Sequence, residues 1–106
     1  MITVTALDAQ NRARADRPLL LVLTRRRSPP SDDAVRAVTA AAREEELEAL
    51  ALDVDDPQNA AFLDELRVRA VPELLVYHRG VVLERTGVHD ADDALDVVVK
   101  ALRRHR

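Results

Sequence analysis

The sequence predicts a single α/β domain over residues 1–106: a three-layer α/β/α sandwich with a mixed sheet. Strand-like and helical segments alternate along the chain, which is typical of a parallel sheet with helices on both faces. A continuous apolar run at residues 18–24 suits a central strand that is covered on both sides. Two strand-like runs meet at Arg79-Gly80 and predict a closing hairpin, which adds an antiparallel edge.

The first half of the chain pairs two strand-like segments with two helical ones. Residues 2–7 are short and β-branched and predict a weak first strand. Residues 7–17 have a helical composition, and Pro18 ends that helix because the residue before a proline avoids the helical conformation. After the strand at 18–24, residues 32–50 predict a second helix. Five apolar residues recur there at helical spacing and form one face: Ala34, Val35, Val38, Ala41 and Ala42.

The second half contains a strand, a helix, the hairpin and a final helix. Residues 47–55 alternate apolar and polar side chains late in their course and predict the strand. Asp56 at the N-cap position and Pro57 at the first helical position predict the next helix start. The final helix, within 89–106, has acidic residues near its start and arginines near its end, which complements the helix dipole. The buried faces of these two helices are predicted to be Phe62, Leu63 and Leu66, and Leu95, Val98 and Leu102. The predicted order is therefore β-α-β-α-β-α-β-β-α.

The composition excludes several classes of function. The formal net charge is −3 and only two aromatic residues occur, so the chain lacks the basic stripe and stacking rings of a general nucleic-acid binder. No apolar run approaches the ~20 residues of a membrane span. The N-terminal segment "MITVTALDAQ" lacks the basic and apolar regions of a signal peptide. We therefore expect a cytoplasmic protein that binds neither nucleic acid nor a membrane.

The chain contains no cysteine, which excludes disulfides, thiolate nucleophiles and cysteine metal ligands. The three histidines are His78, His89 and His105. Their spacing offers no metal site and none has the context of a Ser-His-Asp triad, so we expect them at the surface. The acidic cluster of Asp53, Asp55 and Asp56 is not followed by an EF-hand pattern. We predict no metal, no cofactor and no enzymatic activity.

The second half of the chain resembles the thioredoxin family. The resemblance rests on a strand that ends in an aspartate, a following helix, the segment Val68-Arg69-Ala70-Val71-Pro72-Glu73, and a hairpin with Gly80 at its turn and Gly87 at its end. The order of elements is also that of the family, so the resemblance covers nearly the whole chain. It implies a thioredoxin-like fold in which Pro72 follows a cis peptide bond.

The same resemblance places "RSPPS" where thioredoxins carry "W-C-G-P-C". The residues of that degenerate active-site motif are Ser28, Pro29, Pro30 and Ser31. Ser28 and Ser31 replace the nucleophilic and the resolving cysteine. Arg27 replaces the tryptophan, and Val22 stands where the family has a buried acid. A serine hydroxyl forms no disulfide and is not appreciably ionised near neutral pH, so thiol–disulfide exchange is excluded.

Helix capping explains the two serines without any chemistry. Ser31 is slightly favoured as the N-cap, because the proline that follows Pro29 disfavours helical geometry at that residue. Asp32 and Asp33 then lie in the first turn, near the positive end of the helix dipole. The alternative start has Ser28 as the N-cap and Pro29 at the first helical position.

Three arginines before this helix form a candidate anion-binding site. Arg25, Arg26 and Arg27 flank the helix N-terminus, where backbone N–H groups attract phosphates and carboxylates. Asp32 and Asp33 are expected to offset two of the three positive charges. The alternative is a solvated loop that binds nothing.

A second candidate site is the groove beside Pro72. In thioredoxins, this groove pairs with an extended substrate chain by β-addition. The resemblance implies that its walls here are Arg27, Ser28, Pro29, Val71, Pro72, Gly87 and Val88. The alternative is that Pro72 serves folding alone.

The sequence therefore predicts a redox-inactive thioredoxin-like domain that acts by non-covalent binding. Its partner is predicted to be another protein or a peptide, bound in the manner of a scaffold or chaperone-like module. We expect a monomer or a weak dimer. The alternative function is binding of an anionic small molecule or phosphate by Arg25, Arg26 and Arg27 at the helix N-terminus.

Overall fold

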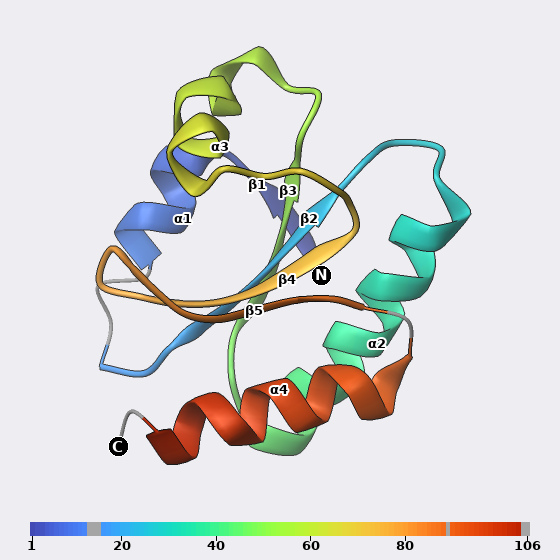
Figure 1. Cartoon of the computed structure of the whole chain (residues 1–106), viewed down its shortest axis with the longest axis vertical. Helices are drawn as coiled ribbons and strands as arrows, with labels where there is room; N and C mark the ends of the chain where they lie inside the picture. Colours follow the sequence, from blue (N-terminus) through green and yellow to red (C-terminus); the bar gives the residue numbers. More distant parts are fainter. Residues whose placement is uncertain (13–15, 89, 105–106) are drawn as a thin grey trace.

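The computed structural model describes residues 1–12, 16–88 and 90–104. Within them, a five-stranded mixed sheet and four α-helices follow one another in the predicted order, which is thereby confirmed (Figure 1). The strands are β1 (Ile2–Val4), β2 (Leu19–Thr24), β3 (Ala49–Asp53), β4 (Glu73–His78) and β5 (Val81–Gly87). The helices are α1 (Ala6–Arg12), α2 (Pro29–Glu45), α3 (Ala60–Leu66) and α4 (Ala91–Arg104), with a 3₁₀ turn, η1 (Pro57–Asn59), before α3.

The strands lie in the order β1-β3-β2-β4-β5. β3 is parallel to both β1 and β2, whereas β4 is antiparallel to β2 and to β5. The predicted hairpin between β4 and β5 turns through Arg79 and Gly80, whose φ angles of 52° and 82° are both positive. Two positive φ angles are what a two-residue hairpin needs to match the twist of its strands, and glycine adopts one of them at no steric cost.

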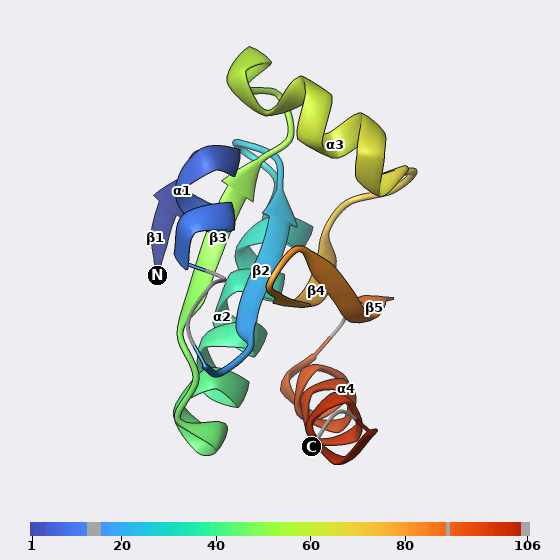
Figure 2. The same ribbon diagram turned by 90° about the vertical axis from the view of Figure 1, so that its left-hand side faces the viewer.

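Apolar side chains fill both faces of the sheet, as the run at residues 18–24 predicts. In β2, Leu19, Leu21 and Leu23 pack on the face that α1 and α3 cover. Leu20 and Val22 alternate with them and pack on the opposite face, against α2 and α4. In Figure 1, α1 and α3 lie on one side of the strands and α2 and α4 on the other, and Figure 2 shows the strands side by side, with α1 in front of them and α2 behind. Period-two alternation thus divides one apolar strand between two cores.

Several elements are shorter than the sequence suggests. α1 ends at Arg12 rather than near residue 17, and residues 13–15 of the predicted helix lie outside the described residues. α3 ends at Leu66 because Arg67 is left-handed, with φ of 54°, and its N–H donates to the carbonyls of Asp64 and Leu63. No α-helix in the described part of the chain is both long and apolar enough to cross a membrane.

The final helix behaves as predicted over the residues that are described. Val98 is buried, and Leu95 and Leu102 pack partly buried against the same core. The carboxylate of Asp90 accepts a hydrogen bond from the N–H of Asp93 at 3.0 Å, which caps the first turn. His89, His105 and Arg106, at the ends of the predicted segment, lie outside the described residues.

Candidate functional site

The loop between β2 and α2 carries the degenerate motif, and its helix starts earlier than predicted. Ser28, not Ser31, is the N-cap: its hydroxyl accepts a hydrogen bond from the N–H of Ser31 at 3.3 Å. Pro29 is the first helical residue, so the favoured assignment is wrong and the alternative is confirmed. Two prolines fit the first turn because the N–H groups they lack have no partner within the helix.

Ser31 has a structural contact of its own. Its side chain is 2% exposed, and its hydroxyl accepts a hydrogen bond from the backbone N–H of Arg25 at 3.0 Å. This bond ties the start of the loop to the first turn of α2. The hydroxyl oxygens of Ser28 and Ser31 therefore both accept hydrogen bonds from backbone N–H groups. Among the described residues, neither is hydrogen-bonded to a basic side chain that would activate it as a nucleophile.

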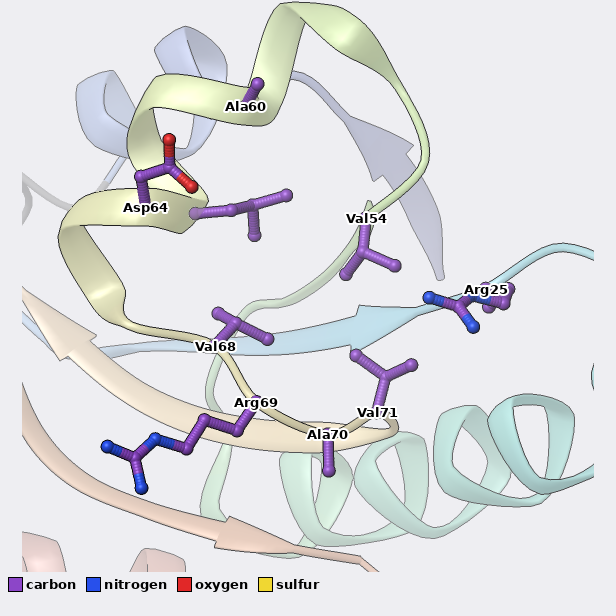
Figure 3. A pocket seen from close by; sticks show the side chains of 9 residues that line it. Arg25, Val54, Ala60, Asp64, Val68, Arg69, Ala70 and Val71 are labelled. Atoms are coloured by element: carbon purple, nitrogen blue, oxygen red, sulfur yellow. The ribbon is translucent and has the colours of Figure 1, made fainter.

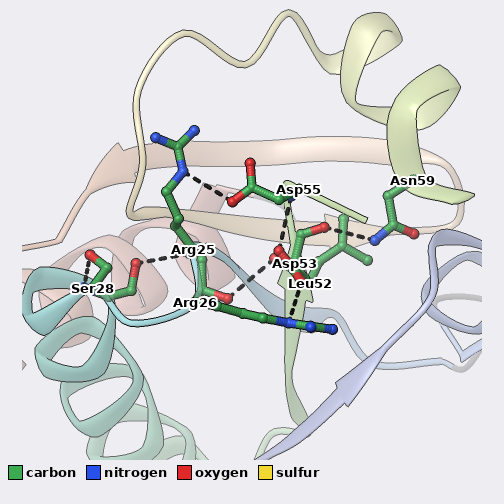
Figure 4. A network of polar contacts seen from close by, with 9 residues as sticks. Arg25, Arg26, Ser28, Leu52, Asp53, Asp55 and Asn59 are labelled. Atoms are coloured by element: carbon green, nitrogen blue, oxygen red, sulfur yellow. Dashed lines mark hydrogen bonds and ion pairs between the residues drawn. The ribbon is translucent and has the colours of Figure 1, made fainter. Parts of the chain in front are cut away.

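Two of the three arginines in the candidate anion site are paired with the end of β3 and the loop that follows it (Figure 4). Arg25 Nε lies 3.3 Å from an oxygen of Asp55, and Arg26 Nε lies 2.9 Å from an oxygen of Asp53. The carboxylates that offset these charges are therefore not Asp32 and Asp33. Asp33 pairs instead with Arg36, one turn further along α2.

Asp53 and its neighbours have a structural role. The Asp53 carboxylate, 8% exposed, accepts a hydrogen bond from the N–H of Asp55 at 2.9 Å. Asp56 caps η1 by accepting from the N–H of Gln58 at 3.0 Å, as predicted. Across residues 1–12, 16–88 and 90–104, no group of three or more acidic or histidine side chains is placed to hold a metal ion.

The structure divides the predicted groove residues among different places. The Val71–Pro72 peptide bond is cis, as the resemblance implies. Val71 lines one cavity, and Pro72 and Gly87 line a second. Val88 is 4% exposed and packs in the core beside α2 and α4, so its side chain is not a wall of the groove. Three others line neither cavity: Arg27, Ser28 and Pro29.

The first cavity lies between α3 and the segment that precedes β4 (Figure 3). Its volume is about 280 Å³, and we call it the valine cavity. Its apolar lining comes from Val54, Leu63, Val68 and Val71. Charged side chains also line it: Arg25, Asp64 and Arg69. Val68 and Val71 point toward α3 and Val54, so together they give this cavity an apolar floor.

The backbone beside the valine cavity has unused hydrogen-bonding capacity. The N–H and C=O groups of residues 69–71 make no hydrogen bond to another described residue. Arg69 and Ala70 are exposed and Val71 is half-buried, so water reaches this segment. An extended peptide backbone can replace that water, residue by residue, at such a segment.

The second cavity lies across the same segment from the first. Its volume is about 390 Å³, and we call it the arginine cavity. Its charged lining consists of Arg67, Arg69, Arg85 and Glu73. Sequence reasoning missed Arg67 and Arg69 as site residues, although both lie in or directly before the segment that carries the family resemblance.

Comparisons with known proteins assign no family. No protein-family model matches the chain, and no curated protein sequence matches it. The candidate site therefore rests on the geometry of the two cavities and on the segment at residues 67–72 that separates them.

Proposed function

We propose that this chain is a redox-inactive thioredoxin-like domain that binds an extended segment of another protein without covalent chemistry. The proposed binding site is the backbone of residues 69–71 together with the valine cavity. The order of the elements supports the thioredoxin-like assignment, because it is the order that the resemblance implies. The absence of cysteine supports a function without thiol exchange, and so do the structural roles of the two serines: Ser28 caps α2, and Ser31 accepts a hydrogen bond from the N–H of Arg25.

One observation carries the proposal: free backbone groups lie beside an apolar cavity. In β-addition, main-chain hydrogen bonds supply affinity, and pockets for alternate side chains supply specificity. Residues 69–71 offer the main-chain hydrogen bonds, since their backbone groups have no partner within the described residues. The valine cavity offers a side-chain pocket, since Leu63 and Val71 can bury an apolar side chain of the bound segment.

The alternative function, binding of a small anion at Arg25, Arg26 and Arg27, has weaker support. Arg25 and Arg26 are held by Asp55 and Asp53, so an anion has to displace a carboxylate from each. Arg27 makes no ion pair with another described residue, but a single exposed arginine is a weak anion site.

Selection of peptides from a random library displayed on phage tests the proposal. Selected peptides are expected to bind the purified protein and to lose about tenfold or more in affinity toward Val71→Asp, which places a charge in the cavity floor. Fluorescence polarisation with labelled synthetic copies of these peptides measures the affinities.

A matched pair of variants guards against misfolding of Val71→Asp. Ala60 lines the valine cavity and its neighbour Ala61 does not, although both are exposed at the start of α3. Ala60→Trp is expected to block the cavity and weaken binding, whereas Ala61→Trp leaves binding unchanged. Equal affinity of the selected peptides for Ala60→Trp and Ala61→Trp overturns the proposed site.

A further inference from the structure

The arginine cavity carries positive charge that the protein itself does not neutralise. Glu73 is the acidic residue in its lining, and Arg85 holds that carboxylate with two contacts of 3.1 and 2.6 Å. Arg85 also donates to the carbonyl of Leu66 at 2.7 Å, which fixes its position. The charges of Arg85 and Glu73 therefore cancel locally, and those of Arg67 and Arg69 remain.

Arg67 and Arg69 are both exposed, and neither makes an ion pair with another described residue. Most other arginines near the site are paired: Arg25 with Asp55, and Arg85 with Glu73. In a chain with a net charge of −3, two unpaired arginines at one cavity are a local excess of positive charge. Such an excess attracts a partner of opposite charge and raises its association rate.

The two cavities lie on opposite sides of one segment. Figure 3 shows Val68 and Val71 pointing toward α3 and the valine cavity, while Arg69 and Ala70 point away from it. Arg69 and Ala70 line both cavities, so the segment is the wall between them. In the extended chain of a bound peptide, successive side chains point in opposite directions. A strand added along residues 69–71 therefore directs alternate side chains toward the two cavities.

We propose that the bound segment alternates apolar and acidic residues. Its apolar side chains enter the valine cavity, beside Leu63 and Val71, and its carboxylates face Arg67 and Arg69. This inference rests on the proposed function and adds the chemistry of the partner to it. Asp64 in the lining of the valine cavity disfavours an acidic side chain of the peptide there. The acidic side chains are therefore directed to the arginine cavity and the apolar ones to the valine cavity.

Synthetic peptides of defined pattern test this inference. A labelled peptide of alternating valine and glutamate is titrated with the protein, beside peptides of alternating valine and glutamine and of alternating serine and glutamate. The valine–glutamate peptide is expected to bind about fivefold tighter than the valine–glutamine peptide, as two exposed charge contacts allow, and this advantage shrinks as salt is added. The serine–glutamate peptide is expected to bind weakly, since it leaves the valine cavity empty.

Two double variants locate the charge contacts. Arg67→Gln/Arg69→Gln is expected to remove the preference for glutamate, so that the valine–glutamate and valine–glutamine peptides bind this variant with equal affinity. Arg43→Gln/Arg103→Gln makes the same change in net charge at exposed arginines outside both cavities, and it is expected to keep the preference.

Four outcomes overturn the inference, and they differ in what they say of the proposed function. If the valine–glutamate and valine–glutamine peptides bind with equal affinity and Ala60→Trp weakens both, the acidic pattern is wrong and the proposed function stands. If the serine–glutamate peptide binds as tightly as valine–glutamate, the arginine cavity is a general anion site. If light scattering shows a dimer that Arg67→Gln/Arg69→Gln dissociates, the occupant is a second copy of this chain. Failure of every peptide to bind overturns both proposals.

Discussion

Asn59 Oδ1 accepts a hydrogen bond from the backbone N–H of Ala6 at 2.8 Å, across more than fifty positions of the chain. The N–H of Ala6 belongs to the first turn of α1 and has no partner within that helix. The other end of the same amide, Nδ2, donates to the carbonyl of Asp53 at 2.9 Å. One buried side chain thus joins α1, the end of β3 and the start of α3, and it sets where α3 lies above the valine cavity.

Replacing Asn59 is expected to destabilise the protein strongly. Asn59→Ala leaves the N–H of Ala6 and the carbonyl of Asp53 without partners in a fully buried place, so the free energy of unfolding should fall by about 2–4 kcal/mol. The exposed neighbour Gln58 is the control, and Gln58→Ala should change stability by less than about 0.5 kcal/mol. Urea denaturation followed by circular dichroism measures both. A loss for Asn59→Ala as small as that for Gln58→Ala would contradict the bridging role.

Aspartate substitutions at the two motif serines distinguish their roles. Ser28→Asp should be tolerated, since aspartate caps helices as well as serine does, whereas Ser28→Ala should cost about 1 kcal/mol. Ser31→Asp should cost about 2 kcal/mol or more, because position 31 is 2% exposed and a carboxylate there loses its hydration. Thermal unfolding of the three variants measures the order. Tolerance of aspartate at 31 but not at 28 would restore Ser31 as the N-cap.

How far the sequence predicts this structure depends on the range of the interactions involved. The order of elements, the Arg79-Gly80 hairpin and the Asp56 cap all follow from residues close together in the chain, and all are observed. The choice of N-cap between Ser28 and Ser31 also depends on neighbouring residues, but two weak preferences oppose each other there. Pro30 disfavours helical geometry at Pro29, whereas a proline such as Pro29 is favoured at the first helical position. In the structure, Ser31 is buried and its hydroxyl accepts a hydrogen bond from the N–H of Arg25, which leaves Ser28 as the N-cap. The sequence alone does not reveal this contact.

The candidate site was harder to predict because its parts are distant in the chain. The pairing of Arg25 with Asp55 joins the loops after β2 and β3, which are parallel neighbours. Because parallel strands end at the same edge of a sheet, the predicted strand order could have indicated this contact. The valine cavity is different, because it depends on where the short helix α3 lies. That position is set by Asn59, whose side-chain amide binds the N–H of Ala6. The spacing of these two residues along the sequence does not indicate the contact.

Thiol–disulfide exchange should be absent and hard to restore. The protein is expected to show no catalysis above background in an insulin-reduction assay with a dithiol reductant, because it has no thiol. Ser28→Cys/Ser31→Cys should give at most weak activity, because the resemblance to thioredoxins places the buried Val22 where they have an acid, and an apolar side chain cannot relay a proton. The same double variant carrying Val22→Asp serves as the comparison, checked first for a native thermal transition. Activity near that of a true thioredoxin with Val22 unchanged would show that this replacement matters little.

Tyr77, the single tyrosine, should make stability fall at alkaline pH. Burial, reinforced by the nearby charge of Glu65, raises the pKa of the Tyr77 phenol above its ordinary value of about 10. The folded state therefore favours the neutral phenol. This contribution to the free energy of unfolding is complete below the unfolded pKa and is lost as the pH rises through the folded one. Tyr77→Phe keeps the edge-to-face contact with Phe62, whose ring centroid lies 5.9 Å away, and should lose less stability over that range. Tyrosinate absorbance, titrated with and without denaturant, measures the shift directly, and coincident midpoints would contradict it.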